Sequence, residues 1–275
     1  MVVKLTTLEQ ELLRRFRAAY QGIPPDWAWP YPPPIPLVGS KYAPGRGLLV
    51  YASAENLHGL AKRCPPHDPR WCSFSGEAAW VRYRHRYEVA GRQSCGFFPE
   101  VGMKPVNDGG LLCAAWFVIA CGGQRCPPTP RELLDRIAVT NWCKFVLCNP
   151  CRNQDYAGDL QKLAHSRPLV EAELDVLRPR FAIVPKSVFL GHGEVREGMT
   201  RASPRTTFIP VMQFNGRVIN THLKRHDAEG PRLAVEWAGT PLAEWMSQVR
   251  NMSRSHAWRF IAHLSEVMAA SLPQG

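Results

Sequence analysis

Asn141 has a side chain and a sequence position that suit recognition of a flat, hydrogen-bonding ligand. It directly follows residues 137–140 (IAVT), an apolar run that is too short for a helix and predicts a strand buried on both faces. In an open parallel sheet, ligands bind beyond the carboxyl ends of the strands. A side-chain amide at that place offers donors and an acceptor that match the edge of a pyrimidine. The alternative is that Asn141 only caps the strand end.

The segment after this strand carries cysteines whose spacing suits a metal. Residues 142–155 are rich in Cys, Asn, Pro and Arg, which predicts a loop over the site. Cys148 and Cys151 have metal-ligand spacing, and Cys64 and Cys72 could complete a four-thiolate site for zinc or an iron–sulfur cluster. The default prediction is free thiols and no cofactor.

A second candidate contact surface is the segment 80–89 (WVRYRHRYEV), in which aromatic and basic residues alternate. As an edge strand, this segment would place Arg82, Arg84 and Arg86 on one face, where they could lie along a phosphate backbone. The alternative is an ordinary solvated edge strand.

The overall charge favours a polyanionic partner. An excess of 34 Lys+Arg over 23 Asp+Glu gives a formal net charge of +11 and a pI of about 9.4, which suits DNA, RNA or an anionic membrane. No apolar run is long enough to span a bilayer, and residues 1–21 lack a signal-peptide core. These features predict a cytoplasmic protein whose 9 cysteines are reduced or metal-bound.

The elements that would position these residues alternate between strand and helix. Thr6 and Glu9 fit a capping box at the start of an amphipathic helix, and residues 23–36 form a proline-dense strap. Ser166 should cap a later helix that has Pro168 in its first turn. Strands are predicted at 47–52, 137–140, 181–185, 208–213 and 217–220; helices at 111–120, 127–134, 166–177, 240–250 and 256–270, with a turn at 53–57 leading into a short helix from Glu55.

This alternation predicts an α/β fold, a three-layer α/β/α sandwich with a mostly parallel central sheet. Length allows one large domain or two small ones. We divide the chain into an N-terminal helix and strap (residues 1–46), an α/β core (47–235) and C-terminal helices packed on the core (236–275).

Five segments, taken in order, carry a family pattern. A first strand and its loop read LLVYASAEN (48–56), and a loop with paired phenylalanines and a Pro-rich turn reads CGFFPEVGMKPVNDGG (95–110). A strand then ends in Asn (AVTN, 138–141). A helix and strand read VEAELDVLRPRFAIVP (170–185), and a last segment carries a histidine (VINTHLKR, 218–225). Together these segments resemble the uracil-DNA glycosylase superfamily.

The resemblance departs from the usual uracil-removing pattern in two loops. The first motif usually has Pro, and Asp or Asn at the water-positioning place, where this chain has Ser53 or Ala54 with Glu55 and Asn56 just beyond. The last motif usually reads His-Pro-Ser, but here Leu and Lys follow His222. Altered loops suit a glycosylase that removes bulky modified pyrimidines, including those with which phages mark their DNA; this step is an analogy.

The resemblance implies a role for each matching residue in cleaving an N-glycosidic bond. The nucleotide must leave the stack, the departing base needs donors, and the cationic sugar needs a carboxylate or a positioned water. Glu55 would be the base or electrostatic partner, the alternative being that it only starts a helix; Asn56 could position the water instead, and His222 would donate to the base oxygen. The base would contact Ser53, Phe97 or Phe98, and Asn141; DNA would contact Leu223 as a wedge, and Lys224, Arg225 and Lys144 at phosphates.

Two hypotheses follow for function. The first is a monomeric, monofunctional DNA glycosylase that acts on uracil or a modified pyrimidine and leaves an abasic site, with no membrane partner. The second is a catalytically inactive nucleic-acid-binding protein of the same fold. A nucleotide hydrolase lacks support, because the chain has no phosphate-binding Gly loop and no nucleophile elbow. The first hypothesis requires Glu55, Phe97, Asn141 and His222 to converge on one pocket.

Overall fold

The computed structural model describes residues 5–22, 32–56, 77–81, 108–147, 160–212, 216–247 and 254–271, and within them a mixed sheet forms the centre of the molecule. Its five strands lie in the order β1-β3-β2-β4-β5, and every neighbouring pair is parallel except β1 with β3. The strands are β1 (Leu37–Val38), β2 (Leu48–Asn56), β3 (Ile137–Leu147), β4 (Phe181–Pro185) and β5 (Thr207–Val211).

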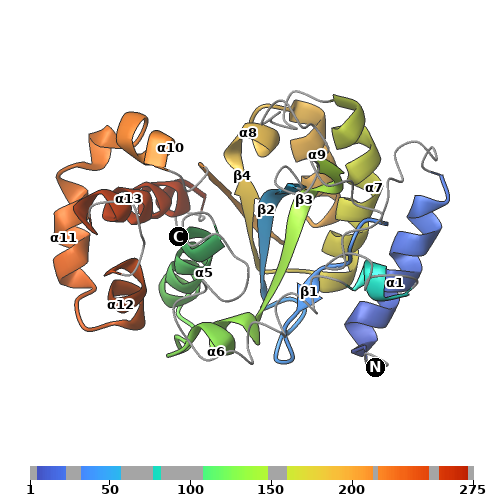
Figure 1. Cartoon of the computed structure of the whole chain (residues 1–275), viewed down its shortest axis with the longest axis horizontal. Coiled ribbons are helices and arrows are strands. Elements are labelled where there is room, and N and C mark those ends of the chain that lie inside the picture. Colours follow the sequence, from blue (N-terminus) through green and yellow to red (C-terminus); the bar gives the residue numbers. More distant parts are fainter. Residues whose placement is uncertain are drawn as a thin grey trace, which may run out of the picture.

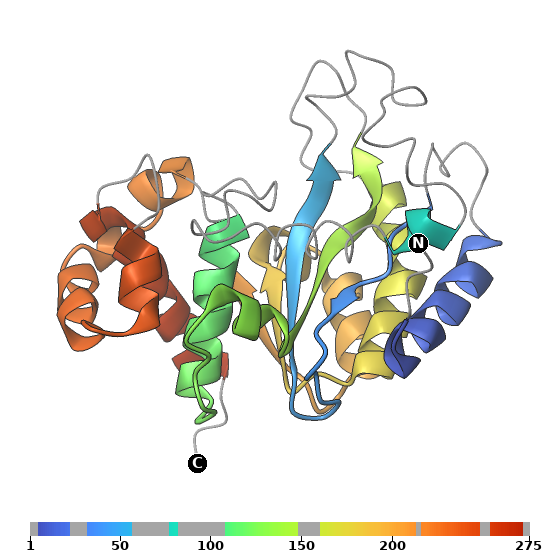
Figure 2. The same cartoon turned by 60° about the horizontal axis from the view of Figure 1, so that its bottom comes forward.

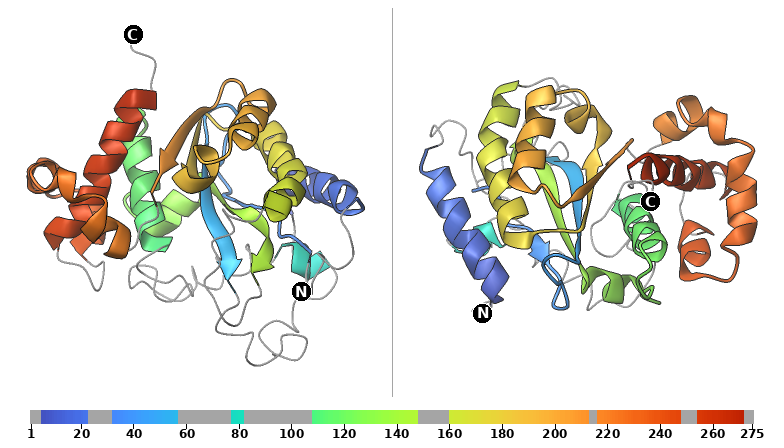
Figure 3. Two further views of the ribbon diagram at one scale, coloured as in Figure 1. Left: turned by 90° about the horizontal axis from the view of Figure 1, so that it is seen from above. Right: turned by 180° about the vertical axis from the view of Figure 1, so that it is seen from behind.

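Helices cover both faces of this sheet (Figures 1 and 3). Side chains alternate along β2: Leu48 and Val50 pack with α5 (Asp108–Cys121) and α13 (Arg254–Ser271), whereas Leu49 and Tyr51 pack with α1 (Thr7–Tyr20) and α7 (Leu160–Leu177). We call these the α5 face and the α7 face. The predicted α/β class and three-layer arrangement agree with this structure.

Shorter helices complete the layers. Most of them follow the strands in sequence, and α9 packs on α7. They are α3 (Glu77–Trp80), α6 (Pro130–Leu134), α8 (Lys186–Phe189), α9 (Gly193–Ala202), α10 (Gly216–Thr221), the 3₁₀ helix η6 (Lys224–His226), α11 (Glu229–Glu236) and α12 (Pro241–Ser247). No helix in the described ranges combines the length and apolar character needed to cross a bilayer.

The order of the strands creates a topological switch point. From β2 the chain passes to β3 on one side, then returns across β2 to β4 on the other side. The intervening helices lie on opposite faces, α5 before β3 and α7 before β4. In open α/β sheets of this kind the ligand crevice lies beyond the carboxyl ends of the two strands where the order reverses, here β2 and β4.

Strands β2 and β3 extend past the rest of the sheet at this carboxyl edge. The pairing of β2 with β4 covers only Leu48 to Val50, whereas its pairing with β3 continues to Asn56 and Leu147. Figure 2 shows the two arrowheads side by side. Near the end the register shifts, because the step from Ala54 to Asn56 lies opposite the step from Cys143 to Leu147. Irregularities of this kind bend strands and are frequent beside active sites.

Several predicted elements are confirmed with small shifts at their ends. The strand at 181–185 is observed with these bounds, and α5, α6, α13 and β5 lie where helices and a strand were expected. Thr240 caps α12, since its Oγ1 accepts a hydrogen bond from the Ala243 amide at 3.4 Å. Of the proline-dense strap, residues 33–36 are buried and the Ile35 amide donates to the Trp80 carbonyl at 2.8 Å. The basic segment with Arg82, Arg84 and Arg86 lies outside the described residues.

Three local predictions are wrong. Residues 53–56 continue β2 instead of turning into a helix. Helix α7 begins at Leu160, so Ser166 and Pro168 lie inside it, and Ser166 Oγ accepts a hydrogen bond from the Lys144 amide of β3 at 3.1 Å instead of capping the helix. Residues 217–220 belong to helix α10, not a strand. Ile219 and Leu223 are both fully buried in the α5-face core, and their four-residue spacing is that of one side of a helical turn.

The capping box of α1 is formed as predicted and offers a first test. Thr6 Oγ1 accepts from the Glu9 amide at 3.3 Å, and Glu9 Oε2 accepts from the Thr6 amide at 2.8 Å. Thr6→Ala should lower the free energy of unfolding by about 1 kcal/mol, measured by urea denaturation. Thr7→Ala, an exposed position in the same helical turn, is the matched control and should change stability far less. Equal effects of the two substitutions would contradict a role of the cap.

Candidate functional site

The carboxyl edge of β2 and β3 brings together part of the predicted site. Asn141 pairs in register with Ala52, so the strand segment that contains Ser53, Glu55 and Asn56 starts one residue beyond that pair. Asn141 is 8% exposed. The prediction that Asn141 ends its strand is wrong, because β3 continues to Leu147. Residues 142–147 extend β3 where a loop was predicted, and the first three of them, Trp142 to Lys144, are buried.

The other residues of the predicted pocket lie partly or wholly outside the described part of the chain. The backbone of Ser53, Glu55 and Asn56 lies in β2, and their side chains fall outside what the structure describes. Six further candidate residues lie wholly outside the described part of the chain. They are the two candidate stacking rings and the four candidate metal thiols: Phe97, Phe98, Cys64, Cys72, Cys148 and Cys151.

The segment after α10 differs from its predicted role. His222 is exposed, and so is Lys224, which agrees with side chains that could reach a ligand. Leu223 is 0% exposed and belongs to the α5-face core, so the prediction that it wedges into DNA is wrong. The Arg225 guanidinium is exposed but already donates to the Glu266 carboxylate at 2.6 Å.

Lys144 cannot contact a phosphate backbone in this structure, so that prediction is also wrong. Its ammonium is ion-paired with Glu173 of α7, and the two side chains are 1% and 0% exposed. Thr140 joins them, because its Oγ1 accepts from Lys144 Nζ at 2.8 Å and donates to Glu173 Oε1 at 3.1 Å. The pair therefore links β3 to α7 on the α7 face of the sheet.

Burial shifts the pKa values of both members of this pair. Removal from water lowers the pKa of Lys144 and raises the pKa of Glu173, while their mutual attraction opposes both shifts. The Tyr51 ring lies 5.4 Å from the ammonium. Burial, with the nearby Glu173 charge, raises the pKa of Tyr51 well above its usual value. An enclosed pair of this kind is a structural link and not a site open to substrate.

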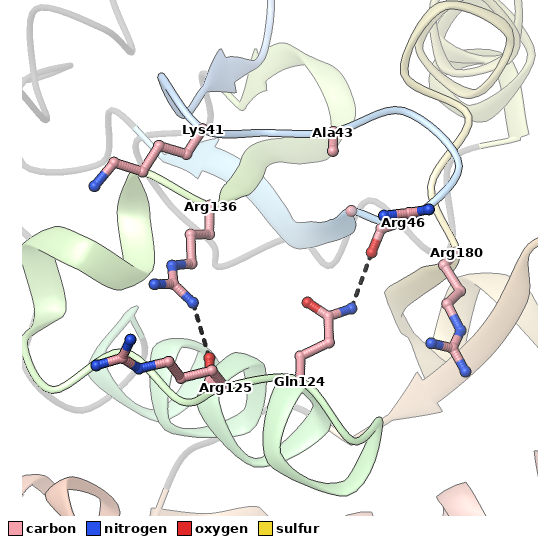
Figure 4. A pocket seen from close by; sticks show the side chains of 8 residues that line it. Lys41, Ala43, Arg46, Gln124, Arg125, Arg136 and Arg180 are labelled. Atoms are coloured by element: carbon pink, nitrogen blue, oxygen red, sulfur yellow. Dashed lines mark hydrogen bonds between the residues drawn. The ribbon is translucent and has the colours of Figure 1, made fainter.

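A basic pocket lies at the opposite, amino edge of the sheet (Figure 4). It is a cavity of about 560 Å³ lined by residues that immediately precede strands, Gly47 before β2, Arg136 before β3 and Arg180 before β4. Its walls are held by two hydrogen bonds: Arg136 donates to the Arg125 carbonyl at 2.8 Å, and Gln124 to the Arg46 carbonyl at 3.1 Å. The full lining is Lys41, Ala43, Arg46, Gly47, Gln124, Arg125, Arg136 and Arg180.

This pocket concentrates positive charge. Five of its eight lining residues are Lys or Arg, and none of the eight carries a carboxylate. Like charges held around one cavity repel each other, and an anion in the cavity would relieve that repulsion. The sequence motifs do not predict this site. Its signal was present, because a basic residue directly precedes each of β3 and β4, and the amino ends of parallel strands share one edge.

A further cluster, also missed, contains two histidines and a glutamate. His226 ends η6, while His263 and Glu266 lie one helical turn apart on α13. Their potential ligand atoms all lie within 4.8 Å of one another. Burial, with nearby His226 and Lys186, lowers the pKa of His263 to about 4, so its imidazole is neutral at pH 7. The His-x-x-Glu spacing on a helix was the available sequence signal.

Scans against protein-family models, curated proteins and solved structures found no match to this chain. The resemblance to uracil-DNA glycosylases therefore stays a prediction from the sequence motifs.

Proposed function

We propose that this protein is a DNA glycosylase whose base pocket lies at the carboxyl edge of the sheet, beside the switch point between β2 and β4. It would extrude uracil or a modified pyrimidine, hydrolyse the N-glycosidic bond and leave an abasic site. The observation that carries the proposal is the register of β2 with β3, in which Ala52 lies opposite Asn141. Because side chains alternate along a strand, position 55 falls on the opposite face from Ala52 and Asn141, so action of both groups on one ligand depends on the register shift between Ala54 and Asn56.

Burial of Asn141 favours base recognition over a solvated role. Hydrogen bonds formed away from water discriminate strongly between partners, because an unmatched buried group keeps its full desolvation cost. The amide would read the pyrimidine edge, while Glu55 would stabilise the cationic sugar or activate water. His222, exposed after α10, would donate to the base oxygen as charge develops there.

The fold agrees with the family suggested by the motifs. A mostly parallel sheet covered on both faces by helices is compatible with the fold that the resemblance implies, and in such sheets ligands bind beyond the carboxyl ends of the strands. The departures of the first and last motifs favour a modified pyrimidine over unmodified uracil as the substrate, since these loops would contact the ring and its substituents.

The test is mass spectrometry of free bases released from DNAs that contain uracil or phage-type modified pyrimidines. We expect release of one class of base, together with alkali-labile abasic sites in equal amount. DNA without modified bases is the control and should release none. Absence of base release from every substrate at enzyme concentrations that saturate DNA binding would overturn the proposal.

The basic pocket favours a second candidate function, binding of nucleic acid without chemistry. It lies at the amino edge, so it could engage a phosphate backbone independently of the carboxyl edge. Binding of nucleic acid would agree with the polyanionic partner that the net charge of +11 suggests. The two functions can be separated, because they depend on opposite edges of the sheet.

Charge removal in the pocket should weaken DNA binding without changing the kind of base released. For the double substitution Arg136→Gln and Arg180→Gln, we expect the slope of log affinity against log salt to fall by about 2, roughly 0.9 for each lost phosphate contact. Fluorescence anisotropy with labelled DNA over a salt series measures this slope. Arg232→Gln, at an exposed residue paired with Glu236, is the matched control. An unchanged slope would show that DNA does not use this pocket.

A further inference from the structure

The cluster of His226, His263 and Glu266 has features that the proposed glycosylase reaction does not use. His226 Nε2 lies 3.3 Å from Glu266 Oε2, and His263 Nδ1 lies 3.9 Å from the same oxygen. The histidines are 6% and 1% exposed, whereas the glutamate side chain is half exposed. Two buried imidazoles thus face one carboxylate that can adjust its position from the surface.

A cation already occupies the position between two of these groups. The Arg225 guanidinium donates to Glu266 Oε2 at 2.6 Å and to His226 Nε2 at 3.2 Å. Accepting this hydrogen bond requires that His226 Nε2 carries a lone pair, the form that binds a metal. The Arg225 side chain is 57% exposed, so its guanidinium can move into water without disturbing the core.

His263 supplies the second, independent observation. Neither of its ring nitrogens has a hydrogen-bond partner among the described residues, although both are buried. A buried imidazole without partners is costly, since each polar atom has lost its water. A ligand that accepts the Nδ1 lone pair would remove part of that cost, and Nδ1 faces Glu266.

We propose that His226, His263 and Glu266 form a binding site for a divalent transition metal such as Zn²⁺, which replaces the Arg225 guanidinium. Two imidazoles and one carboxylate are a donor set that zinc accepts, and three protein ligands leave a fourth position for water or substrate. Bonds of about 2.0–2.1 Å in a tetrahedral site place ligand atoms roughly 3.3 Å apart. The two separations that involve Glu266 Oε2 are 3.3 and 3.9 Å, and all three ligand atoms lie within 4.8 Å of one another.

Hard cations fit this cluster less well. Mg²⁺ and Ca²⁺ take oxygen ligands, and only one of the three side chains offers oxygen.

The test uses the full-length chain, stripped of metal with a chelator and titrated with Zn²⁺ in competition with a chromophoric indicator. We expect one equivalent of Zn²⁺ that is lost in Glu266→Gln and in His263→Ala. The affinity should fall by at least about a hundredfold, since even outer-shell partners typically contribute about 10–100-fold. Glu236→Gln, at another exposed carboxylate paired with an arginine, is the matched control and should bind like the parent chain.

Arg225→Gln provides the sharpest readout, because the proposal predicts a gain. Removal of the competing guanidinium should tighten Zn²⁺ binding by about tenfold, and Arg232→Gln should not. Glu266→Gln and Arg225→Gln change exposed side chains, so they remain informative if His263→Ala impairs folding. Unchanged affinity in both Glu266→Gln and Arg225→Gln would overturn the proposal.

Cobalt(II) distinguishes this site from one made by cysteines. Bound at His226, His263 and Glu266, Co²⁺ should give visible ligand-field bands without a thiolate-to-metal charge-transfer band. A stoichiometric site whose spectrum shows thiolate ligation, and which Glu266→Gln leaves intact, would assign metal binding to the cysteines and overturn the proposal.

Discussion

Replacing Lys144 with methionine is expected to lower the free energy of unfolding by about 3–5 kcal/mol. The substitution leaves the Glu173 carboxylate without its cation at a position that is 0% exposed. The hydroxyls of Thr140 and Tyr51 remain beside this carboxylate and favour its charged form, but neither of them carries a positive charge. The free energy is to be measured by urea denaturation followed by circular dichroism.

A double substitution separates loss of the pair from loss of packing. Lys144→Met combined with Glu173→Leu removes both charges and should recover most of the stability of the parent chain, because apolar replacement of a buried pair is often close to neutral. Arg232→Met, which breaks the exposed pair with Glu236, should cost at most about 1 kcal/mol. If the double variant were as unstable as the single one, the cost would come from packing and not from the unpaired charge.

The single variant should also depend on pH in a defined direction. Burial raises the pKa of Glu173, and loss of Lys144 removes the attraction that opposes this shift. The folded state then binds a proton more tightly than the unfolded state, so stability is greatest below the unfolded pKa and falls as the pH rises through the folded pKa. Lys144→Met should therefore be less destabilising at about pH 5 than at about pH 8.

Glu55→Gln is expected to reduce the rate of base release by about 10²–10⁴-fold while DNA affinity stays unchanged. A neutral amide can neither accept a proton from water nor balance the charge on the sugar. The measurement is single-turnover release of the base from the DNA that the parent chain cleaves best. This prediction rests on the proposed glycosylase function.

Two controls define the outcome for Glu55. Glu197→Gln, at an exposed carboxylate on α9, should leave the rate unchanged. If Glu55→Gln retains the parent rate and Asn56→Ala abolishes it, the water is positioned by the amide and Glu55 has no chemical role. An unaltered urea transition for Glu55→Gln is needed to attribute any loss to chemistry.

Elements whose signals are local could be predicted from the sequence. The capping box of Thr6 and Glu9, the apolar strand Phe181–Pro185 and the closing helix around residues 256–270 each depend on residues a few positions apart. The failures involve partners that are far apart in sequence. Local sequence predicts a helix cap at Ser166 and a surface cation at Lys144, whereas their partners, the β3 backbone and Glu173, lie 22 and 29 positions away.

The sequence by itself determined the α/β class and most of the helices and strands, because hydrophobic periodicity and capping act over a few residues. Only the tertiary structure decided which distant residues meet. The sheet order brings the Arg46 carbonyl to Gln124 across 78 positions, and helix packing brings His226 to His263. Such meetings follow from burial of whole faces against one another, a free-energy gain that no short window of sequence contains.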